Sequence, residues 1–323
     1  MLLHAFVVFI ANNIYRNREQ VDSAEPFPKR RRVEFEVITL DLAENARDLI
    51  RYYLLLLCLG PEELRKRSDS DLEKLREQLS DLDLEKLRKQ QSDSDLEKLY
   101  DQLSRPACTT ELPFPFPGNR KPVERFAITD GIYWSYVGRE YFTTLLNEVT
   151  QLMGSATRKL SLYGTIGYGK SYLLAALVCY LTVNGTRIVY IPDCRECCEE
   201  PLNYFLAAML FTWADDIKAQ EAIMRLKSMD DIWDFFKNKR NILFIVDQTN
   251  ALDVEEKSGD TVSNDRKKDV RKWIDWFTSQ HKVIYSVSAN YQARVRTVQK
   301  QTNDKKLYVY GGFSAVSPPN MTL

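Results

Sequence analysis

The sequence predicts an α/β fold in which a mainly parallel sheet is flanked by helices in three layers. Short apolar runs typical of buried strands recur along the second half of the chain, at 159–163, 187–191, 242–246, 282–287 and 307–310. Stretches typical of helices separate most of them, at 201–213, 216–227, 229–237 and 266–279. Alternating strands and helices are characteristic of crossover connections, which join parallel strands. We expect a helical, repeat-containing N-terminal region to precede this unit.

The first of these strands leads into a phosphate-binding motif. The octapeptide Gly164-Thr165-Ile166-Gly167-Tyr168-Gly169-Lys170-Ser171 fits the pattern G-x-x-x-x-G-K-[ST]. In this pattern the glycines let backbone N–H groups converge on one anion, the lysine reaches the β- and γ-phosphates, and the hydroxyl ligates magnesium. An apolar helix beginning at Tyr172 completes the strand–loop–helix order that the motif requires. We therefore predict a P-loop NTPase in which residues 164–172 bind ATP and Ser171 binds Mg²⁺.

A second apolar strand ends in an acidic residue, Asp247. A carboxylate at the carboxyl end of a buried strand can hold the water shell of magnesium beside a phosphate loop. Gln248 follows, where many such ATPases carry a glutamate that activates water. Glutamine can orient the attacking water but cannot accept its proton. The sequence thus predicts slow hydrolysis, or a switch that mostly holds nucleotide.

The strand at 282–287 is followed by two polar residues, Ser288 and Asn290. If this strand lies between the other two, both residues are candidate sensors of the γ-phosphate. Asn290 has an alternative interpretation as a helix N-cap. Arg294 and Arg296 come next, and each either stabilises transferred charge in a neighbouring subunit or faces solvent.

Composition excludes some partners and leaves others open. The 323 residues have a formal net charge of zero, so no global field draws the chain to nucleic acid or anionic membrane. No apolar run reaches the roughly 20 residues that a membrane helix needs. The six cysteines are scattered, which favours reduced thiols. Cys194, Cys197 and Cys198 could begin a zinc site, but a second pair of ligands is missing.

The chain divides into four parts by composition. Residues 1–61 contain an apolar start, either a leader or a buried strand, and the basic cluster Lys29-Arg30-Arg31-Arg32, either a nuclear import signal or a solvated charge run. Residues 62–104 hold twelve-residue repeats containing Leu-Glu-Lys-Leu, a period that predicts short helices or a spacer rather than a coiled coil. Residues 105–121 form a Pro-rich linker, and 122–323 form the NTPase domain.

Together these motifs resemble the ATPase module of Crinkler effectors and the related retrotransposon-hotspot proteins. Gly138-Arg139-Glu140 also resembles the signal-transduction ATPases with numerous domains, which suggests that Arg139 lies near the base or ribose. The segments that carry the likeness are Val137–Glu140, Leu162–Ser171, Val189–Cys194, Phe244–Leu252 and Tyr285–Asn290.

The resemblance implies a secreted effector of a fungus or oomycete that acts in host nuclei. In some relatives the ATPase is coupled to a C-terminal nuclease. Two departures are evident: the N-terminus does not match the usual Crinkler header, and no Asp…Glu-x-Lys cluster able to hold two catalytic metals follows the ATPase motifs. Nuclease activity is therefore not expected here.

Three hypotheses follow. The first is a slowly hydrolysing regulatory ATPase using Lys170, Asp247, Gln248 and either Asn290 or Ser288. The second is a non-enzymatic scaffold, stabilised by nucleotide, that binds a host nuclear protein. The third is a nucleic-acid-binding ATPase whose contacts come from a local basic patch, which would comprise Lys267, Lys268, Arg271 and Lys272. Assembly into a homo-oligomer is compatible with each of the three hypotheses.

Overall fold

The computed structural model describes residues 93–128, 133–164, 167, 169–253, 262–288 and 305–309. The main sheet has five strands: β3 (Lys159–Gly164), β4 (Arg187–Ile191), β5 (Ile242–Val246), β6 (Lys282–Ser288) and β7 (Lys305–Val309). All five agree with the predicted strands to within two residues at either end. Strands buried on both faces of a parallel sheet appear in the sequence as continuous apolar runs, which made these strands predictable. In β5, for example, every residue is buried.

Helices alternate with these strands. They are α8 (Glu140–Gly154), α9 (Lys170–Val183), α10 (Cys194–Glu199), α11 (Pro201–Thr212), α12 (Ile217–Met224), α13 (Met229–Lys237) and α14 (Asn264–Phe277). The four helices predicted after β4 are all confirmed, with ends that differ by up to three residues. Local signals set some of the boundaries. Pro201 begins α11, and Ser228 and Asp231 form a reciprocal capping box at the start of α13.

The strand order of the main sheet is β4-β5-β6-β3-β7, and every neighbouring pair is parallel. The strand β6 therefore lies between β3 and β5, which is the arrangement that the sensor hypothesis requires. In register, Gly164 is opposite Ser288. Because the carboxyl ends of parallel strands meet at one edge, the segments that follow β3, β4, β5 and β6 converge there.

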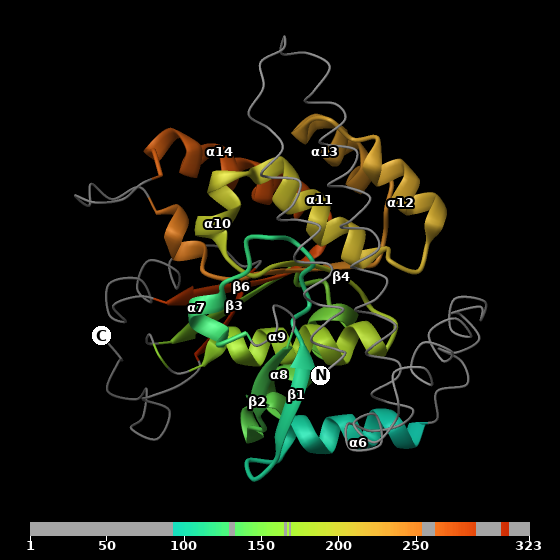
Figure 1. Ribbon diagram of the computed structural model, residues 1–323, viewed down its shortest axis with the longest axis vertical. Coiled ribbons are helices and arrows are strands. Elements are labelled where there is room, and N and C mark those ends of the chain that lie inside the picture. Colours follow the sequence, from blue (N-terminus) through green and yellow to red (C-terminus); the bar gives the residue numbers. More distant parts are fainter. Residues whose placement is uncertain are drawn as a thin grey trace, which may run out of the picture.

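Helices cover both faces of the sheet (Figure 1). On one face lie α8 and α9, and on the other lie α10, α11, α13 and α14. Both α9 and α11 are apolar on nearly every side, and most of their residues are buried. This confirms the predicted α/β character with a parallel sheet between two helical layers. No helix of the described residues combines the length and apolarity needed to cross a membrane.

The segment predicted as a Pro-rich linker is partly built into the structure. Its residues Thr109–Pro113 form β1, which pairs antiparallel with β2 (Tyr133–Val137). Phe114 and Phe116 are fully buried. The prolines of this stretch alternate with aromatic side chains that fill the core, so its described residues belong to the folded unit. Where the domain begins stays a prediction.

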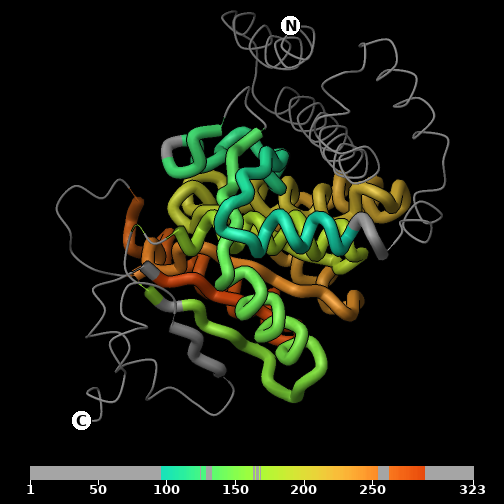
Figure 2. The backbone as a smooth tube through the Cα atoms, turned by 90° about the horizontal axis from the view of Figure 1, so that it is seen from below, coloured from blue at the N-terminus to red at the C-terminus, as the bar shows by residue number. Residues whose placement is uncertain are grey.

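Part of the last twelve-residue repeat lies in α6 (Asp93–Ser104), which packs across α8 and α9 (Figure 2). Leu99 and Leu103 of this helix are buried. The helical prediction holds for this stretch, while the rest of the repeats and the basic cluster lie outside the described residues.

His281, just before β6, is a buried ionisable group of the core. Its Nε2 lies 3.2 Å from the carbonyl oxygen of Phe236, and its ring packs against Phe244. Burial lowers the pKa of His281, although the Phe236 carbonyl opposes this. The folded protein therefore binds a proton here less readily than the unfolded chain does.

This pKa shift predicts a pH-dependent stability. The stability that neutral His281 contributes is complete above its unfolded-state pKa of about 6.5. It is lost as the pH falls from there toward the lower pKa of the folded state. Chemical denaturation of the parent should show a free energy of unfolding that falls in this window by up to about 1.4 kcal/mol per pH unit. The His281→Gln variant should show a shallower fall, because glutamine can still donate to Phe236 but does not titrate. Parallel curves for the two proteins would contradict the assignment.

Candidate nucleotide-binding site

The predicted phosphate loop connects β3 to α9. Gly167 and Gly169 have φ values of 89° and 78°, in the left-handed region that favours glycine. Gly169 is also the N-cap residue of α9, so the loop ends at the N–H groups of a 14-residue helix. A helix N-terminus with free N–H groups favours an anion. Thr165, Ile166 and Tyr168 lie outside the described residues.

Lys170 is the first residue of α9, and its side chain folds back over the loop. Its Nζ donates to the carbonyl oxygen of Gly164 at 2.9 Å, and the residue is 3% exposed. Burial lowers the pKa of Lys170, and the negative charge of Asp247 opposes this. The lysine is thus held at the start of the loop, where an anion could compensate its desolvated charge.

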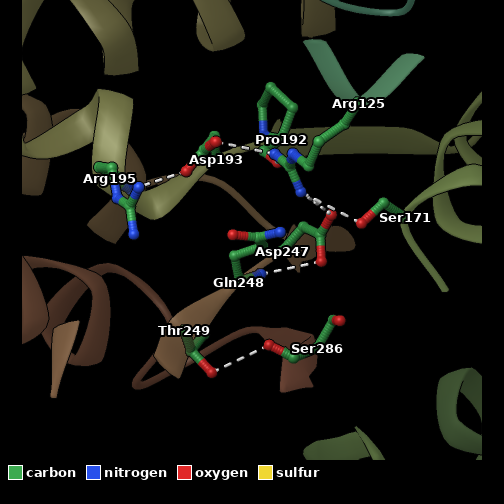
Figure 3. Close-up of polar contacts among 9 residues, drawn as sticks. All are labelled: Arg125, Ser171, Pro192, Asp193, Arg195, Asp247, Gln248, Thr249 and Ser286. Carbon is green, nitrogen blue, oxygen red and sulfur yellow. Dashed lines mark hydrogen bonds and ion pairs between the residues drawn. The ribbon is translucent and has the colours of Figure 1, made fainter. Parts of the chain in front are cut away.

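Asp247 follows β5 and is completely buried. Its N–H donates to the carbonyl oxygen of Ile191, and its Oδ1 accepts from the N–H of Gln248 at 2.8 Å. Burial raises the pKa of Asp247, while the charge of Arg125 and the hydroxyl of Ser171 act in the opposite direction. Figure 3 shows this carboxylate at the centre of a polar cluster. The structure therefore brings Asp247 to Ser171, as the two motifs predicted.

Gln248 adopts a left-handed backbone conformation, with φ 58° and ψ 43°. This conformation is uncommon for a residue other than glycine and is often found at functional sites. Gln248 is the N-cap of the short helix η1 (Thr249–Leu252). The hydroxyl of Thr249 in this helix donates to the carbonyl oxygen of Ser286. Gln248 is thereby fixed between β5 and β6, at the edge where the phosphate loop lies.

Arg125 is one of the site residues that the sequence did not reveal. It lies on α7 (Val123–Phe126), well ahead of every motif. Its Nη1 is 3.2 Å from Ser171 Oγ and 3.5 Å from Asp247 Oδ2. Its Nη2 donates to the carbonyl oxygen of Pro192 at 2.9 Å and to Asp193 Oδ2 at 2.8 Å. One guanidinium therefore joins the segments after β4, β3 and β5 (Figure 3).

Two further polar residues complete the cluster. Asp193 follows β4 and caps α10, because its Oδ1 accepts from the N–H of Arg195. Ser286 lies within β6 with its hydroxyl fully buried. That hydroxyl is near enough to Asp247 to lower its pKa, although its geometry falls short of a hydrogen bond. Asp193 follows β4 and Ser286 lies in β6, the two strands on either side of β5, a relation that only the sheet order reveals.

Tyr172, predicted to contact nucleotide, packs in an aromatic cluster beside the loop. Its ring stacks on Phe126, with centroids 4.8 Å apart and planes 17° apart. Trp134 of β2 meets Phe126 and Tyr172 edge-on, at 5.3 and 5.2 Å. These contacts fix α7 against the first turn of α9, and so they position Arg125.

Arg139 lies against the phosphate loop. A Cβ built on Gly169 would overlap the Arg139 guanidinium. Gly169 thus meets two requirements at once, because it has a positive φ and lies against a neighbouring side chain. The structure places Arg139 beside the loop backbone, at the start of α8.

The remaining predicted residues are less completely placed. Ser288 ends β6 opposite Gly164, while Asn290, Arg294 and Arg296 lie outside the described residues. Cys194, Cys197 and Cys198 are buried, and no group of three or more His, Cys, Asp or Glu in the described part of the chain could hold a metal. The zinc interpretation therefore gains no support.

The predicted basic patch lies on α14. Lys267 is buried, Lys268 pairs with Asp265, Arg271 pairs with Asp253, and Lys272 lies over the Trp276 ring. The nucleic-acid hypothesis gains no support from these contacts and stays a prediction.

Comparison with known proteins gives no relative: no protein-family model and no curated protein matches the chain. The resemblance to Crinkler and retrotransposon-hotspot ATPases thus stays a prediction, and the function has to be argued from the site.

Alanine substitutions at Gly169 and Gly185 test the geometry of the phosphate loop, with Gly185 as the matched control. We expect ATP to raise the melting temperature of the parent and Gly169→Ala to weaken this rise, because the added methyl displaces the Arg139 guanidinium from the loop. Gly185→Ala is the control, since Gly185 has the same φ of 78° but nothing within 4 Å of the added atom. It should lower the free energy of unfolding by about 1 kcal/mol yet keep the full ATP response. An ATP response in Gly169→Ala equal to that of Gly185→Ala would contradict a role for the contact between Arg139 and the loop.

Proposed function

We propose that the protein is an ATP-binding P-loop NTPase, with a three-layer α/β/α fold, that hydrolyses Mg–ATP slowly. One observation carries the proposal: the glycine loop and Lys170 lie at the same sheet edge as the buried carboxylate of Asp247. At this edge the guanidinium of Arg125 contacts both Ser171 and Asp247. Few arrangements other than a phosphate and metal site need these groups together.

The residues present fit magnesium. Arg125 Nη1 stands between Ser171 Oγ and Asp247 Oδ2, so this position already accepts positive charge. Magnesium usually takes one or two protein ligands together with phosphate oxygens and waters, so no larger cluster of acids is needed. Ser171 and Asp247 would hold the ion, which when bound neutralises charge on the β- and γ-phosphates.

The nucleotide would be held by the loop and its lysine. The N–H groups at the start of α9 would bind the phosphates, and Lys170 would exchange the Gly164 carbonyl for phosphate oxygens. Arg139, beside Gly169, adds positive charge to the same region. Ser288 or Asn290 would sense the γ-phosphate.

Gln248 determines the expected rate. Its amide can donate to or accept from the attacking water, which orients the water for in-line attack. It cannot take up the proton that a glutamate would accept, so general-base assistance is missing at this position. Slow turnover follows, and so does a long-lived nucleotide-bound state.

Phosphate release from Mg–ATP tests the proposal. The parent should release phosphate slowly, Lys170→Ala should release none, and Gln248→Glu should be faster by at least roughly tenfold because a general base is restored. Lys237→Ala is a control at an exposed position on α13 and should match the parent.

The possible outcomes separate the hypotheses. If the parent releases no phosphate but ATP raises its melting temperature, and Lys170→Ala lacks this rise, the protein is a nucleotide-stabilised binding module. Gln248 is the observation that favours this second function. If ATP neither is hydrolysed nor stabilises the parent, both functions are refuted.

We further propose, on the family resemblance, that the ATPase belongs to an effector that binds a host nuclear protein. The basic cluster at Lys29, Arg30, Arg31 and Arg32 is the segment expected to direct import, and it lies outside the described residues. A fluorescent fusion of the full chain should accumulate in nuclei, and replacement of these four residues by alanine should abolish the accumulation. Equal nuclear signal from both fusions would mean that the cluster is an ordinary charged surface.

A further inference from the structure

We propose that Arg125 is a built-in counter-ion that occupies the magnesium position in the nucleotide-free protein, and that binding of Mg–ATP moves its Nη1 away from Ser171 and Asp247. This inference rests on the proposed function of the site and adds a property to it. The protein should bind magnesium together with nucleotide and not alone.

The geometry of the guanidinium divides it into two ends. Nη1 lies 3.2 Å from Ser171 Oγ and 3.5 Å from Asp247 Oδ2, so it shares the lone pairs that a metal ion would use. Magnesium approaches oxygen ligands to about 2.1 Å. The ion and Nη1 therefore cannot hold these two oxygens at the same time.

The opposite end is anchored independently of the metal ligands. Nη2 donates to the Pro192 carbonyl at 2.9 Å and to Asp193 Oδ2 at 2.8 Å. Asp193 is itself held in place as the N-cap of α10. Arg125 can thus release Ser171 and Asp247 while it keeps the bonds of Nη2 to the segment after β4.

The backbone of Arg125 is held as well. Its neighbour Phe126 is fully buried between Trp134 and Tyr172, and Tyr172 directly follows Ser171. The segment that carries the arginine is therefore tied to the helix that carries the metal ligand. We expect the guanidinium to reorient without movement of α7 as a whole.

Charge explains why the nucleotide-free protein needs this residue. Asp247 is completely buried, and a buried carboxylate without a partner strongly destabilises a fold. Arg125 forms an ion pair with it, at the rim of the site with a quarter of its side chain exposed. The arginine thus pairs with the carboxylate until a metal ion replaces it.

Thermal melting of the full chain in magnesium without nucleotide tests the inference, with sodium chloride used to match ionic strength. The parent should not respond to millimolar Mg²⁺ alone. Arg125→Gln should melt at a lower temperature, and Mg²⁺ alone should then raise its melting temperature by at least about 2 °C, because the ion replaces the missing charge. A parent that responds as strongly as the variant, or a variant that does not respond, would overturn the inference.

Arg120→Gln is the matched control. Arg120 also bridges two carboxylates, Glu196 and Glu200 around α10, but it is 41% exposed and lies outside the site. This variant should behave as the parent in Mg²⁺. A magnesium response in Arg120→Gln equal to that of Arg125→Gln would show general ion binding and would also overturn the inference.

A double variant keeps the test decisive if Arg125→Gln folds poorly. Arg125→Gln with Asp247→Asn removes both charges, so it should melt above the single variant and should lose the response to Mg²⁺. If it is no more stable than the single variant, Arg125 is not the counter-ion of Asp247. Failure of the proposed function would look different, because ATP with Mg²⁺ would then not stabilise the parent.

Discussion

The buried charge of Asp247 is the interaction on which the site depends. This carboxylate directly follows β5, whose residues are all buried, and is itself completely shielded from water. Its charge requires donors and a cation, which come from Gln248, Ser171 and Arg125. Since these residues belong to three separate segments, the need to satisfy one carboxylate ties the phosphate loop, β5 and α7 together.

The parallel sheet makes this convergence possible. With β6 placed between β3 and β5, the loop, the acid and the end of β6 open onto one edge, and β4 adds Asp193 from the far side. The helices on both faces are largely apolar and bury the strands. The polar side chains of the site thus gather at this edge, where low dielectric surroundings strengthen charge interactions.

The site as a whole suggests a regulator more than a fast enzyme. In the proposed function, Gln248 would limit proton transfer and Arg125 would compete with free magnesium for Ser171 and Asp247. Both features would favour a protein that changes state when Mg–ATP binds and keeps that state for long. The aromatic contacts of Phe126 with Trp134 and Tyr172 give a route by which the site and the antiparallel pair β1–β2 could respond together.

The sequence by itself determined the five strands of the main sheet and most helices, because apolar periodicity is a local pattern. It also pointed to Lys170, Ser171 and Asp247 as candidate site residues, whose spacing to their strands is short. It did not identify Arg125, Asp193 or Ser286, and it did not predict the strands β1 and β2 or the burial of Phe114. Those features depend on strand order and on packing between distant segments, so only the tertiary structure decided them.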